Sequence, residues 1–138
     1  MLAGARVGAA AIAAAEELIA GSREARRPVD PKAKNYHWND LTMGLFGALD
    51  AGADTVVLVD GAGNVVEGPG FNVFCVKDGA IATPDAGMLE GITRRTVIEM
   101  AQSLKLPIQI RPVAAQELRA ADEAFLSTSG GGVLPVTQ

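Results

Sequence analysis

Two stretches of the chain carry apolar residues at helical spacing, residues 41–49 and 92–104. The first follows Asn39-Asp40, a pair that can cap a helix, and it ends before Gly52. The second predicts an amphipathic helix, and a shorter helix is predicted over residues 114–121. The residues expected on the inward face of the second helix are Val97, Ile98, Met100, Ala101 and Leu104.

Short β-branched or alternating segments predict the strands. These segments are residues 55–60, 65–67, 71–76, 80–83, 107–113 and 124–127. Glycine-rich turns join several of them, and Lys77-Asp78-Gly79 is a hairpin signal. Strands in an antiparallel meander with a few helices predict an α+β fold. A dinucleotide fold or a P-loop is excluded, because the sequence holds neither glycine fingerprint.

Residues 1–27 differ from the remainder. Alanine dominates there, and the segment is interpreted as a helix or frayed arm that carries no chemistry. The division expected is therefore an Ala-rich N-terminal segment over residues 1–27 and a functional domain over residues 28–138.

Composition and charge narrow the class of protein. With 138 residues, 49% of them hydrophobic, the chain suits one folded domain. A net charge of −4 argues against a general nucleic-acid binder. One Cys and one His exclude a disulfide framework and a Cys/His zinc cluster, so no metal site is expected. Cys75 is predicted to be a buried small hydrophobe. No apolar run reaches the length of a membrane span, and the cytoplasm is the expected compartment.

Four segments share their order and spacing with one known family. Their sequences are KNYHWNDL from Lys34, EGPGFNVF from Glu67, TP with LEGITR between Thr83 and Arg94, and EAF with STSGG from Glu123. Together they resemble the class IV (fold type IV) aminotransferases, which use pyridoxal 5'-phosphate and include D-amino-acid, branched-chain and (R)-amine transaminases. The resemblance implies the large cofactor-binding domain of that fold, an antiparallel-rich sheet or pseudo-barrel with flanking helices.

The chemistry of this cofactor requires a lysine that forms a Schiff base and then moves a proton. The chain has four lysines, of which Lys77 and Lys105 stand at a hairpin turn and a helix end. The pattern favours Lys34 over Lys32 modestly, because Lys34 leads into an aromatic segment where partial burial is expected. The resemblance makes Lys34 the catalytic lysine, whereas His37 is interpreted as a packed or hydrogen-bonded residue.

The pyridine nitrogen needs a carboxylate and the phosphate needs backbone N–H groups and hydroxyls. From the residues alone, an exposed strand-end glutamate is the favoured interpretation of Glu67, and Thr93 could equally be a plain helix cap. The glycine-rich segment after Thr128 could be no more than a flexible turn. The resemblance implies that Glu67 contacts the pyridine nitrogen and that Leu89 packs on the ring. It places phosphate contacts at Gly91, Ile92, Thr93, Thr128 and Ser129.

Three neighbours of these residues are assigned no chemistry. Asn72 is expected to be a structural or supporting amide on the same side of its strand as Phe74. Arg94 and Arg95 are interpreted as surface charges.

Family members are longer, with a small N-terminal domain that holds a phosphate-binding arginine and the residues that select the substrate. No part of residues 1–27 resembles that domain, so the chain is expected to be a cofactor-binding core truncated at both ends. The predicted function is a pyridoxal-phosphate-dependent transaminase acting on an amine or amino acid and a keto acid. The alternatives are an aminodeoxychorismate lyase-like enzyme and a non-catalytic truncated core. A homodimer is expected, with no nucleic-acid or membrane partner.

Overall fold

The computed structural model describes residues 5–6, 32–34 and 38–137. Within them the helices are α2 (Asn39–Asp50), α3 (Ile92–Ser103) and α4 (Ala115–Arg119). The strands are β1 (Ala5–Arg6), β2 (Glu67–Gly68), β3 (Phe71–Lys77), β4 (Ala80–Thr83), β5 (Ile108–Ile110), β6 (Glu123–Thr128) and β7 (Gly132–Thr137).

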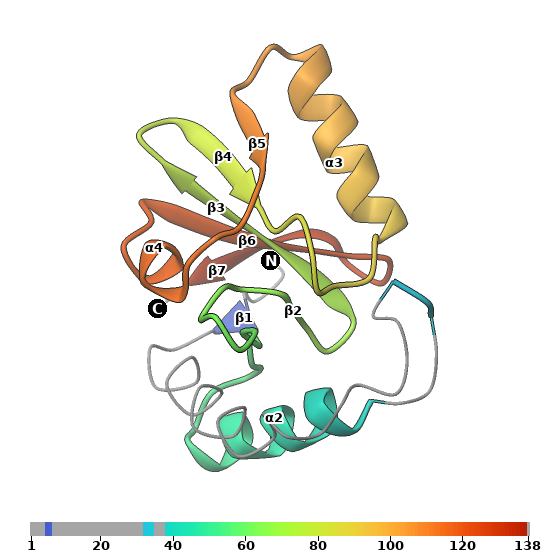
Figure 1. Cartoon of the computed structure of the whole chain (residues 1–138), viewed down its shortest axis with the longest axis vertical. Coiled ribbons are helices and arrows are strands. Elements are labelled where there is room, and N and C mark those ends of the chain that lie inside the picture. The colour runs from blue at the N-terminus through green and yellow to red at the C-terminus, as the bar shows by residue number, and fades with distance from the viewer. Residues whose placement is uncertain (1–4, 7–31, 35–37, 138) are drawn as a thin grey trace.

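The described strands form one mixed sheet in the order β1-β7-β6-β3-β4-β5, with β2 paired to β3 beside this path. Its pairs are antiparallel except β1 with β7 and β4 with β5, which are parallel. Figure 1 shows α3 and α2 at opposite ends of the view, with the sheet between them. The predicted α+β fold with an antiparallel-rich sheet is confirmed.

Two tight hairpins set the register around β3. Between β3 and β4 only Asp78 and Gly79 lie in the turn, both with positive φ (49° and 76°), as a type I′ turn requires. Between β2 and β3 the turn is Pro69-Gly70, and Gly70 has a φ of 82°. A proline followed by a glycine with positive φ is typical of a type II turn.

Alternation along β3 sends its side chains to opposite faces of the sheet. Val73 and Cys75 enter the main apolar core, which the segment before β2 and the helix α4 cover. Asn72 and Phe74 point to the other face, where the Phe74 ring stacks on Phe125 with centroids 4.7 Å apart. The helix α3 packs against β6 and β5. Cys75 is 1% exposed, so its predicted burial is confirmed.

Three predicted strands differ from the structure. In each case the backbone near Val65 forms isolated hydrogen bonds with neighbouring segments in place of a regular strand ladder. Residues 55–60 are mostly buried but form only a bridge, between Val59 and Val65, although Leu58 exchanges backbone hydrogen bonds with residues 66 and 67. Within residues 65–67, only Glu67 enters a strand, as the first residue of β2. The predicted strand over residues 107–113 shortens to β5, because Val113 accepts a hydrogen bond from the Val65 N–H instead of continuing the ladder.

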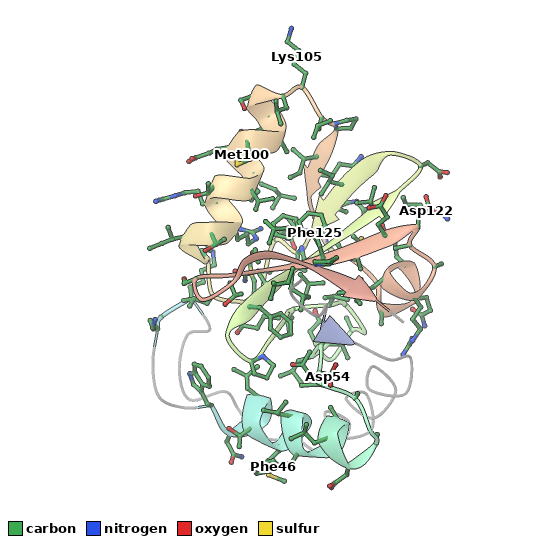
Figure 2. The ribbon with its side chains drawn as sticks, turned by 180° about the vertical axis from the view of Figure 1, so that it is seen from behind. Phe46, Asp54, Met100, Lys105, Asp122 and Phe125 are labelled. Carbon is green, nitrogen blue, oxygen red and sulfur yellow. The ribbon has the colours of Figure 1, made fainter. Side chains whose placement is uncertain are left out.

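The inward face predicted for α3 is partly wrong. On α3, Ile98 and Ala101 are buried, but Met100 and Leu104 are 56% and 64% exposed. On α2, Phe46 is exposed, and Figure 2 shows it on the side away from the sheet. The N-cap of α2 is Trp38, with no side-chain cap, so the predicted capping by Asn39-Asp40 is also wrong.

The strand β7 was not predicted, because Gly132 and Pro135 interrupt the strand pattern. Its partner β1 replaces part of the helix expected at the N-terminus. The rest of that predicted helix lies outside the described residues, as do Tyr36 and His37. In the part of the chain that the structure describes, no helix is long and apolar enough to cross a membrane.

Candidate active site

The start of α3 presents backbone N–H groups with no side chain to cap them. Gly91 is the N-cap residue, makes no side-chain cap hydrogen bond, and precedes a first turn without acidic residues. Ile92 is exposed and Thr93 is half-buried. The first N–H groups of a helix lack intrahelical partners and carry partial positive charge, so this helix start can bind an anion.

Glu67 and Asn72 lie opposite each other on β2 and β3 and hold the same backbone unit. The Glu67 carboxylate accepts a hydrogen bond from the Leu89 N–H at 3.0 Å, and the Asn72 amide donates to the Leu89 carbonyl at 2.7 Å. Glu67 is half-buried, and Asn72 is buried. These two contacts fix Leu89 two residues before the N-cap of α3, so the structure brings Glu67, Leu89 and Gly91 together.

Ser127 continues the same polar row across the sheet. It is the register partner of Asn72 on β6, so both side chains lie on the same face. Ser127 is 2% exposed, and its hydroxyl is the one buried side-chain polar atom among the described residues without a hydrogen-bond partner. Most buried hydroxyls are hydrogen-bonded, so the Ser127 hydroxyl is a group that a polar atom of a ligand could satisfy. Sequence reasoning passed over Ser127, although its place in the register of β6 could have identified it.

Thr128 and Ser129 follow at the turn between β6 and β7. Thr128 is half-buried and its hydroxyl accepts a weak hydrogen bond from the Gly130 N–H at 3.4 Å, while Ser129 is exposed. In Figures 1 and 2 this turn lies close to the start of α3, which packs against β6. The hydroxyls of Thr128 and Ser129 and the start of α3, which were both predicted to contact the phosphate, therefore lie at the same end of the sheet.

Lys34 is placed beside this end of the sheet by its neighbour Lys32. The Lys32 ammonium forms an ion pair of 3.1 Å with Glu90, the residue between Leu89 and Gly91. In Figure 1 the short cyan segment that carries both lysines lies beneath the start of α3. Lys34 itself is exposed, so the partial burial expected for it is not observed.

Arg94 is buried, which corrects its interpretation as a surface charge. It is 7% exposed, and its guanidinium donates to the Pro84 carbonyl at 2.6 Å and to the Thr83 hydroxyl at 3.3 Å. Burial lowers the pKa of the Arg94 guanidinium. These contacts tie the first turn of α3 to the end of β4. Arg95, by contrast, is exposed, as predicted, and pairs with Glu99.

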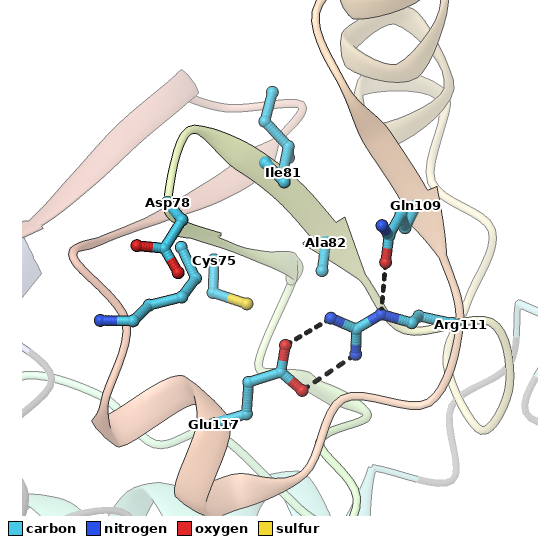
Figure 3. Close-up of a pocket in the computed structure, with 9 residues that line it drawn as sticks. Cys75, Asp78, Ile81, Ala82, Gln109, Arg111 and Glu117 are labelled. Atoms are coloured by element: carbon cyan, nitrogen blue, oxygen red, sulfur yellow. Dashed lines mark hydrogen bonds and ion pairs between the residues drawn. The ribbon is translucent and has the colours of Figure 1, made fainter.

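A hollow of about 320 Å³ lies on the opposite face of the sheet, between β5 and α4. Figure 3 shows the Arg111 guanidinium facing the Glu117 carboxylate there, with Nη1 and Oε2 2.9 Å apart, and Cys75 behind them. The hydrogen bond from Arg111 lowers the pKa of Glu117, and burial raises the pKa of the Cys75 thiol. The row of Glu67, Asn72 and Ser127 does not line this hollow, so the two sites are separate.

The groups at the start of α3 fit pyridoxal 5'-phosphate. An uncapped helix start and nearby hydroxyls suit a phosphate. A half-buried carboxylate suits a protonated pyridine nitrogen, and the unpaired Ser127 hydroxyl leaves a buried polar atom for a ligand to satisfy.

Comparison with known proteins finds branched-chain aminotransferases among the relatives of this chain. The "Probable branched-chain-amino-acid aminotransferase" of Thermotoga maritima is 48% identical over 83 residues, which cover 59% of this chain and 30% of that protein. The solved structure of the branched-chain amino acid aminotransferase of Thermobaculum terrenum in its PLP-form superposes with a TM-score of 0.76. It is 36% identical, and the match covers 80% of this chain and 37% of that one.

A structure with a different named activity also matches. A putative 4-amino-4-deoxychorismate lyase of Legionella pneumophila superposes with a TM-score of 0.75 at 26% identity, covering 80% of this chain and 41% of that one. In these three matches the aligned part of the chain spans about 30–41% of each relative.

The model of the family "Amino-transferase class IV" matches residues 7–138, and this match begins inside the Ala-rich segment. It takes in all four motif segments and the whole polar row at the start of α3. The chain therefore belongs to the class IV aminotransferase family.

Proposed function

We propose that the chain is the cofactor-binding core of a pyridoxal-phosphate-dependent aminotransferase of the branched-chain type. The observation that carries the proposal is the pair of hydrogen bonds that Glu67 and Asn72 form with the backbone of Leu89. Leu89 lies directly before the start of α3, which has no side-chain cap. This arrangement brings a carboxylate and an anion-binding helix end into one site. The similarity to branched-chain aminotransferases supports an amino acid and a keto acid as substrates.

Each residue has a role in this proposal. Backbone N–H groups of Ile92 and Thr93 would bind the phosphate, with the hydroxyls of Thr128 and Ser129 as further donors. Leu89 would pack on the ring, and the Glu67 carboxylate would hold a proton on the pyridine nitrogen. When bound, the cofactor supplies an electron sink for negative charge on the substrate carbon.

Lys34 is the proposed catalytic base. Its amine would carry the cofactor in the resting enzyme and, once the substrate amine has replaced it, move the proton at the substrate carbon. The exposure of Lys34 leaves its amine accessible to a cofactor arriving from solvent. The ion pair of Lys32 with Glu90 supports this assignment, since it occupies the ammonium of the competing lysine.

A lyase that acts on aminodeoxychorismate is the second candidate, and the match to the Legionella pneumophila structure supports it. Both activities use the same cofactor and the same lysine. A third possibility is a core that binds the cofactor without turnover. We further propose a homodimer, residues 1–27 as an Ala-rich segment that carries no chemistry although its Ala5–Arg6 strand joins the sheet, and the cytoplasm as the compartment.

Titration of the full chain with pyridoxal 5'-phosphate tests the proposal. We expect a visible absorbance band that borohydride abolishes, followed by loss of the band on addition of leucine, isoleucine or valine as the amino group moves to the cofactor. Production of pyruvate from aminodeoxychorismate would favour the lyase. A band that no amine discharges would leave only a cofactor-binding core, and absence of any band would contradict all three.

A further inference from the structure

The Asn72 side chain connects strand β3 to the loop before α3. Its amide nitrogen donates to the Leu89 carbonyl at 2.7 Å, and the Gly91 N–H donates to the same carbonyl at 2.9 Å. Asn72 is 5% exposed and lies on β3, which is paired with a neighbour on each side. The amide therefore projects from a rigid strand onto the loop.

Gly91 packs directly on this amide. A Cβ added at Gly91 would lie 2.4 Å from the Asn72 side-chain oxygen, closer than Cβ atoms are found. The φ of Gly91 is −63°, which any residue can adopt, so the close approach and not the backbone conformation requires glycine. The N-cap of α3 is seated on the Asn72 side chain.

We infer that Asn72 is a positioning residue that sets the phosphate-binding start of α3 relative to the Glu67 carboxylate. The inference rests on the proposed function. Asn72 contacts neither end of the cofactor in this scheme. It fixes the distance between them, because its register partner Glu67 serves the pyridine nitrogen while the N-cap that it seats serves the phosphate.

The test compares two ligands, pyridoxal 5'-phosphate and pyridoxal, which lacks the phosphate. For Asn72→Ala in the full chain, we expect the affinity for pyridoxal 5'-phosphate to fall about ten-fold, the size expected for losing one well-placed hydrogen bond. The affinity for pyridoxal should change far less, because only the phosphate end is displaced. The diagnostic quantity is therefore a ratio, the dissociation constant for pyridoxal divided by that for pyridoxal 5'-phosphate, with both constants read from the visible absorbance band. Asn72→Ala should lower this ratio.

A double-mutant cycle with Gly91→Ala gives a second readout. Gly91→Ala alone should lower the ratio as Asn72→Ala does, because the new methyl group meets the amide. In the Asn72→Ala background the methyl group has room, so the second substitution should cost little. Fully additive effects on the ratio would contradict the inference.

Asn64→Ala is the matched control. Asn64 is a partly buried asparagine that bonds to Asp60 in a loop outside the polar row. It should leave the ratio unchanged even if it lowers stability. An unchanged ratio in Asn72→Ala, or in Gly91→Ala should Asn72→Ala not fold, would overturn the positioning role alone. A wild-type chain that binds neither ligand would overturn the proposed function, and the inference with it.

Discussion

The ammonium of Lys32 lies 3.1 Å from the carboxylate of Glu90, and this ion pair joins the segment of Lys34, the proposed catalytic lysine, to the loop before α3. Both side chains are more than half exposed, so the pair adds little to stability. Its importance is geometric, because it brings residues that are 58 positions apart to the same end of the sheet (90 − 32 = 58).

The first prediction concerns which lysine carries the cofactor. After the chain is loaded with pyridoxal 5'-phosphate and reduced with borohydride, peptide mass spectrometry should find the pyridoxyl label on Lys34. Lys34→Ala should abolish the label. Lys32→Ala, which breaks the ion pair with Glu90, should retain it, and a label mainly on Lys32 would disprove the assignment.

The second prediction concerns the charge of Glu67. In Glu67→Gln the amide oxygen can still accept from the Leu89 N–H, so the loop should keep its position while the negative charge is lost. We expect cofactor binding to persist and single-turnover amino transfer to slow by two to three decades, corresponding to a loss of about 2–4 kcal/mol. Stopped-flow absorbance measures this rate, and an unchanged rate would refute the role of the charge.

The third prediction concerns buried Arg94. Arg94→Met keeps much of the apolar volume but leaves the Pro84 carbonyl and the Thr83 hydroxyl without this donor. We expect the free energy of unfolding in urea to fall by about 2–4 kcal/mol. Arg95→Met, one residue further on the exposed side of α3, should change it by no more than about 0.5 kcal/mol. Equal effects of the two substitutions would contradict the burial of Arg94.

The fourth prediction concerns pH. The hydrogen bond from Arg111 lowers the pKa of Glu117 below its ordinary value of 4.5. A carboxyl with a lowered folded-state pKa stabilises the protein above its unfolded-state pKa, and this stability is lost as pH falls through the folded-state value. Wild type should therefore exceed Glu117→Gln in melting temperature at pH 6–7, and the difference should shrink below pH 4.5. A difference that is constant from pH 7 to pH 3 would show that the charge of Glu117 is not involved.

The sequence pattern was sufficient to predict elements whose structure depends on interactions between residues near one another in the chain. The sequence predicted the helix from Ile92, because its apolar period is regular, and the β3–β4 hairpin, because Asp-Gly suits a type I′ turn. It also predicted the fold class and the family, through four motifs in register. The helix and the hairpin depend on residues that are close together in the chain, whereas the family was identified from four motifs spread between Lys34 and Gly131.

Only the tertiary structure decided which side chains meet. Arg94 is buried because the end of β4 offers it a carbonyl and a hydroxyl, and no helical period reveals that partner. Ser127 joins the polar row because β6 pairs with β3 in one register. The hold of Glu67 and Asn72 on Leu89 links residues 17 and 22 positions apart in sequence. Such contacts follow from strand pairing and close packing over long chain separations, which residue spacing along the sequence does not encode.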